Sequence, residues 1–150
     1  LIPDGDLSLF KDNCFDLVLS AFTFDNILVA DNKVKILKEI KRILKPGGKM
    51  VNLVSSPEIY VNEWISFSTK DFPENKYAKS GDKVRIIITD TKDKRPVQDT
   101  LFTDQDYLEL YKKSGLKNLK TFKPLGKGNE PYEWINETRI APWVIYVLKT

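Results

Sequence analysis

Residues 15–22 read Phe-Asp-Leu-Val-Leu-Ser-Ala-Phe, a nearly unbroken apolar run that decides the fold class. An apolar run without alternation is typical of a strand that is covered on both faces, as in a parallel sheet. Asp12 and Asn13 come just before the run and supply the turn that leads into it. We therefore expect a strand over 15–22, buried on both faces within an open α/β sheet.

The segment that follows this strand has helical spacing. Apolar residues recur every three or four positions across residues 33–45, and charged residues occupy the other face. Asp31 or Asn32 can cap the start of this helix, and Pro-Gly-Gly at 46–48 ends it. Residues 49–55 form a second apolar run. A strand, a helix and a second strand joined by tight turns predict a right-handed parallel crossover.

The spacing of apolar residues changes after Ser56. Thr103 to Asp106 has the pattern of a capping box, and Gly115 can end the helix that this box begins. The expected elements are a short helix within 57–67, a loop over 71–82, a strand over 84–88, a helix between 103 and 115, and strands over 116–124 and 143–148.

The composition narrows the possible chemistry. The chain has 150 residues, with no histidine and a single cysteine, Cys14. Without histidine, Ser-His and Cys-His nucleophiles, histidine general bases and the common histidine-containing metal sites are excluded. A single thiol forms neither an intrachain disulfide nor a multi-thiolate metal site. We expect no metal, so any reaction must use carboxylates, tyrosine, lysine, hydroxyl groups or an organic cofactor.

The charge and the thiol content indicate the cellular compartment and the binding partners. The formal charge of +3 is spread over lysines that are mixed with acidic residues, whereas nucleic-acid binders concentrate basic residues in a patch with stacking aromatics. Nucleic-acid binding is therefore disfavoured. No apolar stretch is long enough to span a membrane, and a lone thiol suits a cytoplasmic protein. Because the chain starts at Leu1, we interpret it as a fragment.

Two blocks of sequence resemble the class I S-adenosylmethionine-dependent methyltransferases. In that family an Asp-Ala pair, a Leu-Pro-Phe turn, Asp-Asn-Ser and Phe-Asp-Leu-Val lead into the fourth sheet strand; here Asp4-Gly5 and residues 8–20 follow this order. Residues 37–48, Leu-Lys-Glu-Ile-Lys-Arg-Ile-Leu-Lys-Pro-Gly-Gly, are similar to the family's helix and turn before the fifth strand. Three positions depart from the pattern: Gly5, Leu9 and Cys14 stand where Ala, Pro and Ser are usual.

The resemblance implies an α/β, Rossmann-like methyltransferase sheet that is partial. It would run from the fourth strand onward, as a mixed sheet with an antiparallel C-terminal pair. No glycine-rich loop follows a first strand in this chain, and no acidic residue closes a second strand to hold a ribose. We therefore expect residues 1–150 to be the C-terminal part of a single methyltransferase domain. Residues 57–103 would be an inserted region that covers the substrate.

By the same resemblance, S-adenosylmethionine is the expected cofactor. Asp4 would accept a hydrogen bond from the adenine amino group, and the backbone N–H of Gly5 would reach a ring nitrogen. Ser20, Ala21 and Phe22, at the carboxyl end of a parallel strand, would line the methionine part of the cofactor. Core packing is the stronger interpretation for Phe22.

Substrate and catalytic residues are less clearly marked. Thr23 follows the cofactor segment, and Trp64 and Trp134 lie in the irregular regions where the family builds its substrate cover. Methyl transfer depends mainly on orientation, but an acceptor hydroxyl would benefit from a base. With histidine absent, the candidates for that base are Asp25, Asp90, Tyr60, Tyr132 and Glu133, and none stands out.

Three functions remain open at this point. The leading hypothesis is S-adenosylmethionine-dependent methyl transfer to a small-molecule acceptor by the intact protein, with this chain alone inactive. The alternative is a non-catalytic α/β module that forms a homodimer, exchanges strands or pairs with another chain through the exposed edge of strand 15–22. A nucleic-acid methyltransferase or binder is the third. The sequence does not identify the methyl acceptor.

Overall fold

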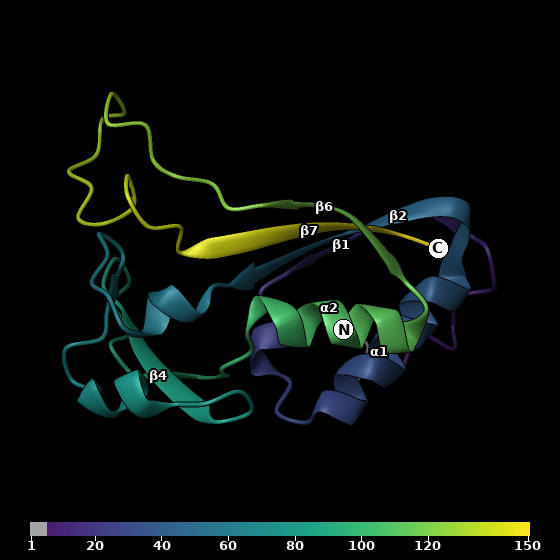
Figure 1. Cartoon of the computed structure of the whole chain (residues 1–150), viewed down its shortest axis with the longest axis horizontal. Helices are drawn as coiled ribbons and strands as arrows, with labels where there is room; N and C mark the ends of the chain where they lie inside the picture. The colour runs from purple at the N-terminus through teal and green to yellow at the C-terminus, as the bar shows by residue number, and fades with distance from the viewer. Residues whose placement is uncertain (1–5) are drawn as a thin grey trace.

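The computed structural model describes residues 6–150, and its main sheet has the strand order β1–β2–β7–β6 (Figure 1). Strand β1 (Phe15–Ala21) pairs in parallel with β2 (Leu44–Ser55). Strand β7 (Trp143–Lys149) lies antiparallel to β2, and β6 (Lys117–Phe122) lies antiparallel to β7. The expected mixed α/β sheet, with antiparallel strands at the C-terminal end of the chain, is confirmed.

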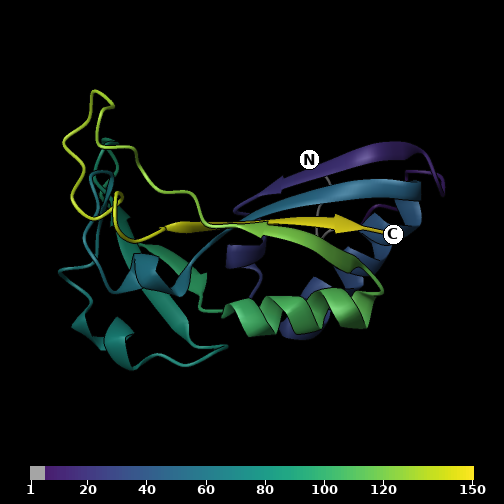
Figure 2. The same ribbon diagram turned by 45° about the horizontal axis from the view of Figure 1, so that its top comes forward.

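Two helices cover one face of this sheet. Helices α1 (Ala30–Ile43) and α2 (Asp104–Ser114) lie side by side on the same side of the strands, as Figures 1 and 2 show from two directions. Their apolar residues interlock with the helix-facing residues of the sheet to form the main core. This core contains Leu37, Ile40, Leu44, Met50, Val54, Tyr107, Leu110, Tyr111, Val144, Tyr146 and Leu148.

The opposite face of the sheet carries no helix within residues 6–150 (Figure 2). Leu17 and Leu19 on β1 are 57% and 69% exposed and alternate with the more buried Val18 and Ser20, so the two pairs lie on opposite faces of the strand, and the leucines lie on the face without helices. The prediction that strand 15–22 is buried on both faces is therefore wrong for the described chain. The apolar run does form a strand, but only one of its faces meets a packing partner.

The sequence predicted both ends of α2 but not the start of α1. Helix α2 has the predicted capping box between Thr103 and Asp106, and Gly115 ends it with a left-handed φ of 77°. Helix α1 begins at Ala30, and no side chain caps its first turn. The expected cap at Asp31 or Asn32 is wrong, because both residues already lie inside the helix.

The region between β2 and α2 forms a second, smaller sheet. Its strands are β3 (Phe67–Ser68), β4 (Lys83–Ile88) and β5 (Val97–Thr100), in the antiparallel order β3–β4–β5. The short helix expected within 57–67 is reduced to one 3₁₀ turn, η3 (Pro57–Tyr60), and a second turn, η4, spans Pro73–Tyr77. A separate apolar core lies under this sheet: Ile59, Tyr60, Trp64, Val84, Ile86 and Leu101. Among the described residues, none of the helices is long and apolar enough to cross a bilayer.

Candidate functional site

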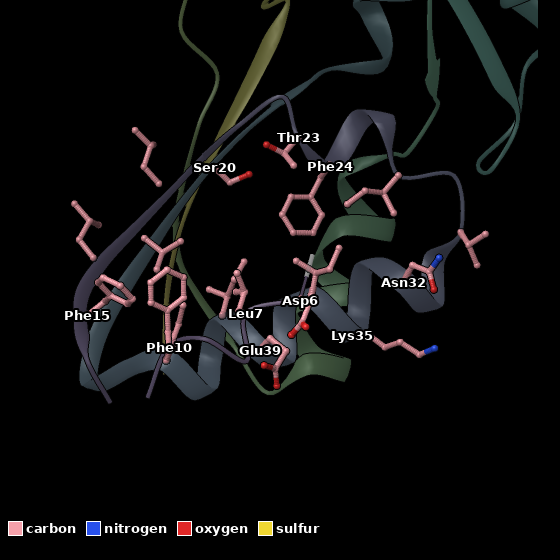
Figure 3. Close-up of a pocket in the computed structure, with 18 of the residues that line it drawn as sticks. Asp6, Leu7, Phe10, Phe15, Ser20, Thr23, Phe24, Asn32, Lys35 and Glu39 are labelled. Atoms are coloured by element: carbon pink, nitrogen blue, oxygen red, sulfur yellow. The ribbon is translucent and has the colours of Figure 1, made fainter. Parts of the chain in front are cut away.

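A large groove runs between strand β1 and helix α1, with a volume of about 1050 Å³ (Figure 3). One end is apolar and is formed by Leu7, Phe10 and Phe15. The other end lies at the carboxyl edge of the sheet, where Ser20 and Thr23 contribute hydroxyl groups. Carboxyl ends of parallel strands are where open α/β sheets bind their ligands. The groove therefore has the position and the mixed lining expected of a ligand site.

Arg42 holds the segment that closes the apolar end. Its guanidinium donates to the carbonyl oxygens of Leu7 (3.0 Å) and Phe10 (2.9 Å) and to the carboxylates of Asp12 and Glu39. Hydrogen bonds to these two carboxylates raise the pKa of Arg42 above its ordinary value. Residues 7–10 are thus fastened to α1, which builds the groove wall from a loop. Sequence reasoning treated Arg42 only as part of the polar helix face.

The backbone leaves β1 through an unusual turn at Phe22. This residue has a φ of 57°, a left-handed conformation that is rare for an aromatic side chain. Its N–H donates to the carbonyl of Leu53 (2.8 Å), its own carbonyl accepts from the side chain of Asn26 (3.1 Å), and its ring meets Trp143 edge-on at 5.9 Å. Strained residues of this kind often occur at functional sites. The turn directs the next residue, Thr23, into the groove.

The predicted cofactor residues fall into three groups. Asp4 and Gly5 lie outside the described residues. Ser20 lines the groove, is 8% exposed, and its hydroxyl has no hydrogen-bond partner. Ala21 and Phe22 follow it at the strand end but do not line the groove. Of the described cofactor candidates, Ser20 alone therefore faces the groove.

The fold places the three predicted substrate residues in different parts of the structure. Thr23 lines the groove. Trp64 is 2% exposed and donates its indole N–H to the carbonyl of Ile59 (2.9 Å), so it belongs to the core of the small sheet. The assignment of Trp64 as a substrate contact is corrected accordingly. Trp134 is half-buried in the loop before β7. Its indole N–H donates to the carboxylate of Glu130 (3.0 Å), and it does not line the groove.

None of the proposed bases faces the groove either. Asp90 is exposed in the loop between β4 and β5, and Tyr132 and Glu133 are exposed in the loop before β7. Tyr60 is buried and donates to Asp99 at 3.0 Å. Asp25, within the 3₁₀ turn η2 (Phe24–Asn26), is 3% exposed. The structure thus does not bring these candidates together.

Asp25 instead belongs to a buried polar cluster behind the groove. Its carboxylate accepts from the backbone N–H of Ser55 (3.0 Å) and from the hydroxyl of Tyr107 (3.2 Å). Burial raises the pKa of Asp25 to about 6 and also raises the pKa of Asp99. Because both carboxylate oxygens accept hydrogen bonds inside the protein and neither is directed at the groove, the geometry favours a structural role for Asp25.

Lys33 supplies the positive charge of this cluster. It is fully buried, donates its ammonium to the carbonyl of Phe24, and lies over the ring of Phe102, 4.0 Å from the centroid. Burial lowers its pKa to about 8. Sequence reasoning missed Lys33, although positions 33, 37 and 40 follow the helical spacing of the buried face and could have placed it there.

The described residues contain no group of three or more His, Cys, Asp or Glu side chains able to hold a metal ion. The site is therefore a groove with an apolar wall, two hydroxyl groups at the carboxyl edge and a buried charge cluster behind it. A twisted sheet with a parallel β1–α1–β2 unit and a ligand groove at the carboxyl edge defines a Rossmann-like α/β class of protein.

Comparison with known proteins narrows this class. Residues 4–52 match the family model described as "Methyltransferase domain". A ubiquinone/menaquinone biosynthesis C-methyltransferase, UbiE, from Burkholderia multivorans is 30% identical over 130 residues, covering 84% of this chain and 49% of that protein. The chain spans about half the length of the curated relatives that it matches.

Solved structures agree on the fold. A SAM-dependent methyltransferase from Methanosarcina mazei superposes with a TM-score of 0.64 at 16% identity, covering 99% of this chain and 65% of that one. A Burkholderia thailandensis 1,6-didemethyltoxoflavin-N1-methyltransferase, solved with bound 1,6-didemethyltoxoflavin and S-adenosylhomocysteine, gives a TM-score of 0.55 at 12% identity, covering 99% of this chain and 48% of that one. Residues 4–52 are thus similar to the methyltransferase domain family, and the fold of the chain is that of S-adenosylmethionine-dependent methyltransferases.

Proposed function

We propose that this chain forms the acceptor-side part of a methyltransferase domain that transfers a methyl group from S-adenosylmethionine to a small molecule. The observation that carries the proposal is the groove at the carboxyl edge of β1, in the part of the chain that matches the methyltransferase model. A small-molecule acceptor is supported by the relative named as a ubiquinone/menaquinone biosynthesis C-methyltransferase.

The groove suits this cofactor in size and in chemistry. Its volume of about 1050 Å³ and apolar wall can take an extended organic molecule. The unpartnered hydroxyl of Ser20 offers a hydrogen bond at the carboxyl edge. When bound, S-adenosylmethionine supplies an electrophilic methyl group on a sulfonium. The residues of this chain then have to orient the two reactants and exclude water, which accounts for most of the catalysis in such a displacement.

The small sheet is proposed to be the substrate cover, as an insertion over residues 57–103 in a domain that includes residues 1–150. It has its own core and joins the main sheet near η2, next to the polar end of the groove. The burial of Trp64 moves the proposed acceptor contact toward Thr23. Asp4 and Gly5 remain predicted adenine contacts.

Titration with S-adenosylhomocysteine tests the cofactor site. In a ¹⁵N-labelled sample we expect signals at the carboxyl end of β1, from Ser20 to Phe24, to shift at millimolar ligand. We expect calorimetry on this chain to show binding far weaker than micromolar, because no glycine-rich loop is present to hold the carboxypropyl end.

Ser20→Val should abolish these shifts, whereas Thr121→Val, on the exposed strand β6, should leave them unchanged. Micromolar binding by the wild-type chain would overturn the proposal that this chain holds only part of the cofactor site. Shifts spread evenly over the protein, with no effect of Ser20→Val, would exclude the groove as that site.

The uncovered edge and face of β1 support the alternative function of a pairing module. Leu17 and Leu19 are exposed, and β1 is hydrogen-bonded along one edge only within residues 6–150. An exposed apolar edge of this kind promotes association. Under this proposal the chain forms a homodimer or exchanges strands through β1.

Light scattering on Leu19→Lys tests this alternative. We expect the wild-type chain to dimerise and the variant to associate roughly a hundredfold more weakly, because two ammonium groups would be brought to the interface. Leu108→Lys places the same charge on exposed helix α2, at a residue 37% exposed, and should leave the association unchanged. A wild-type chain that stays monomeric at high concentration would contradict the pairing module.

A further inference from the structure

A buried charge cluster lies where the small sheet meets the carboxyl edge of the main sheet. Lys33 comes from α1, Asp25 from the turn η2 and Asp99 from β5 of the small sheet. All three are buried, at 0%, 3% and 7% exposure. Isolated charges are costly in a protein interior, so buried ions are expected to be paired and hydrogen-bonded.

We propose that Lys33 is a positioning residue: with Asp25 and Asp99 it fixes the small sheet to the turn Thr23–Asn26 and so orients one wall of the groove. The importance of that orientation for methyl transfer rests on the proposed function. The fixing itself does not, because it is a property of this chain's own contacts.

The hydrogen bonds converge on the turn from three directions. Lys33 donates to the carbonyl of Phe24, and Asp25 accepts from the backbone of Ser55 at the end of β2 and from Tyr107 on α2. The turn is therefore tied to α1, to β2 and to α2 at once. Since Thr23 is the first residue of this turn and lines the groove, these bonds set the position of a groove residue.

The small sheet meets this turn at β5, the strand that carries Asp99. Asp99 accepts from Tyr60 of η3 at 3.0 Å, and the ring of Phe102, just after β5, lies under the Lys33 ammonium at 4.0 Å. A cation over an aromatic ring is attracted more strongly when both are removed from water. The Lys33 ammonium thus contacts Phe24 of the turn and Phe102 beyond β5, whereas Asp99 is hydrogen-bonded within the small-sheet region and is acted on by Lys33 through its charge.

The charge balance of the cluster makes the proposal testable. The other titratable groups packed against it are the hydroxyls of Tyr60, Tyr107 and Tyr111, and burial raises the pKa of each, so they stay neutral. Lys33 is the cluster's only cation among the described residues. Without it, two carboxylates remain buried together, and ionising both becomes unfavourable.

Lys33→Met is the informative variant, because methionine keeps an apolar stem of similar length and removes the charge together with the hydrogen bond to the carbonyl of Phe24. We expect the protection of the Ser55 amide against hydrogen exchange to fall at least roughly tenfold at pH 7, where most of Lys33 is charged, since one pKa unit of lost interaction is a factor of ten. At pH 5 Asp25, whose pKa burial raises to about 6, takes up a proton, and the loss should be much smaller. Amide signals of residues 23–26 should shift at pH 7.

Two further variants separate charge from packing. Lys38→Met, on the exposed face of α1, should change neither protection nor signals. Lys33→Met/Asp99→Asn should recover most of the protection at pH 7, because one carboxylate and its repulsion are removed. If Lys33→Met does not fold at pH 7, the double variant and Lys33→Met at pH 5 should still fold.

A purely structural role for the lysine stem predicts a different result. The loss would then be equal at pH 5 and pH 7, and Asp99→Asn would not restore it. Either observation would overturn the proposal. Neither depends on cofactor binding, so failure here is distinguishable from failure of the proposed function, which the S-adenosylhomocysteine titration tests separately.

Discussion

Trp64→Ala should destabilise the chain by about 3–5 kcal/mol, the range for truncating a large buried aromatic side chain. Trp64 is 2% exposed, packs in the core of the small sheet and donates its indole N–H to the carbonyl of Ile59. The substitution leaves both a cavity and a buried acceptor without its partner. Urea denaturation followed by circular dichroism measures the change in the free energy of unfolding.

Trp134→Ala is the matched control for this prediction. Trp134 is half-buried in the loop before β7 and lies outside both apolar cores. Its removal should cost about 1 kcal/mol, the centre of the range for single substitutions. Equal stabilities of the two variants would show that Trp64 is no core residue and would return it to the candidates for substrate contact.

The free energy of unfolding changes with pH, and Asp25→Asn should alter that change between pH 4 and pH 7 by about 3 kcal/mol. Burial raises the pKa of Asp25 from its ordinary 3.8 to about 6 in the folded protein. Two pKa units correspond to about 3 kcal/mol. The folded state therefore binds this proton more tightly than the unfolded state does, and the free energy of unfolding falls as pH rises from about 4 to about 6.

The asparagine variant has no proton to lose at this position. Relative to it, the wild-type chain should gain stability as pH is lowered from 7 to 4, the reverse of the usual behaviour of a paired carboxylate. Thermal denaturation across this range gives the difference. Asp90→Asn removes one exposed negative charge and serves as the control. A wild-type advantage that grows toward higher pH would show that Asp25 is stabilised as the anion.

Much of the main sheet could be predicted from local patterns. The apolar run 15–22, the helical spacing after it and the second apolar run correspond to β1, α1 and β2. The capping box at Thr103 and the glycine at 115 mark the two ends of α2. These features are readable because the spacing of apolar residues and the chemistry of helix ends act over a few neighbouring residues.

The candidate site was predicted less completely. Ser20 and Thr23 lie where strand-end reasoning placed them, because the carboxyl edge of a parallel sheet follows from the crossover alone. The positions of Trp64 and Asp25 could not be inferred in this way. Both lie in short irregular segments, whose burial depends on contacts with residues far away in the chain.

The sequence by itself determined the β1–α1–β2 unit, the capped helix α2 and the carboxyl edge that carries Ser20, since each arises from local spacing. Only the tertiary structure decided that Leu17 and Leu19 are uncovered and that Lys33, Asp25 and Asp99 are buried. The physical reason is that whether a side chain is buried depends on what packs against it. For these residues the partner, or its absence, is set by elements distant in the sequence.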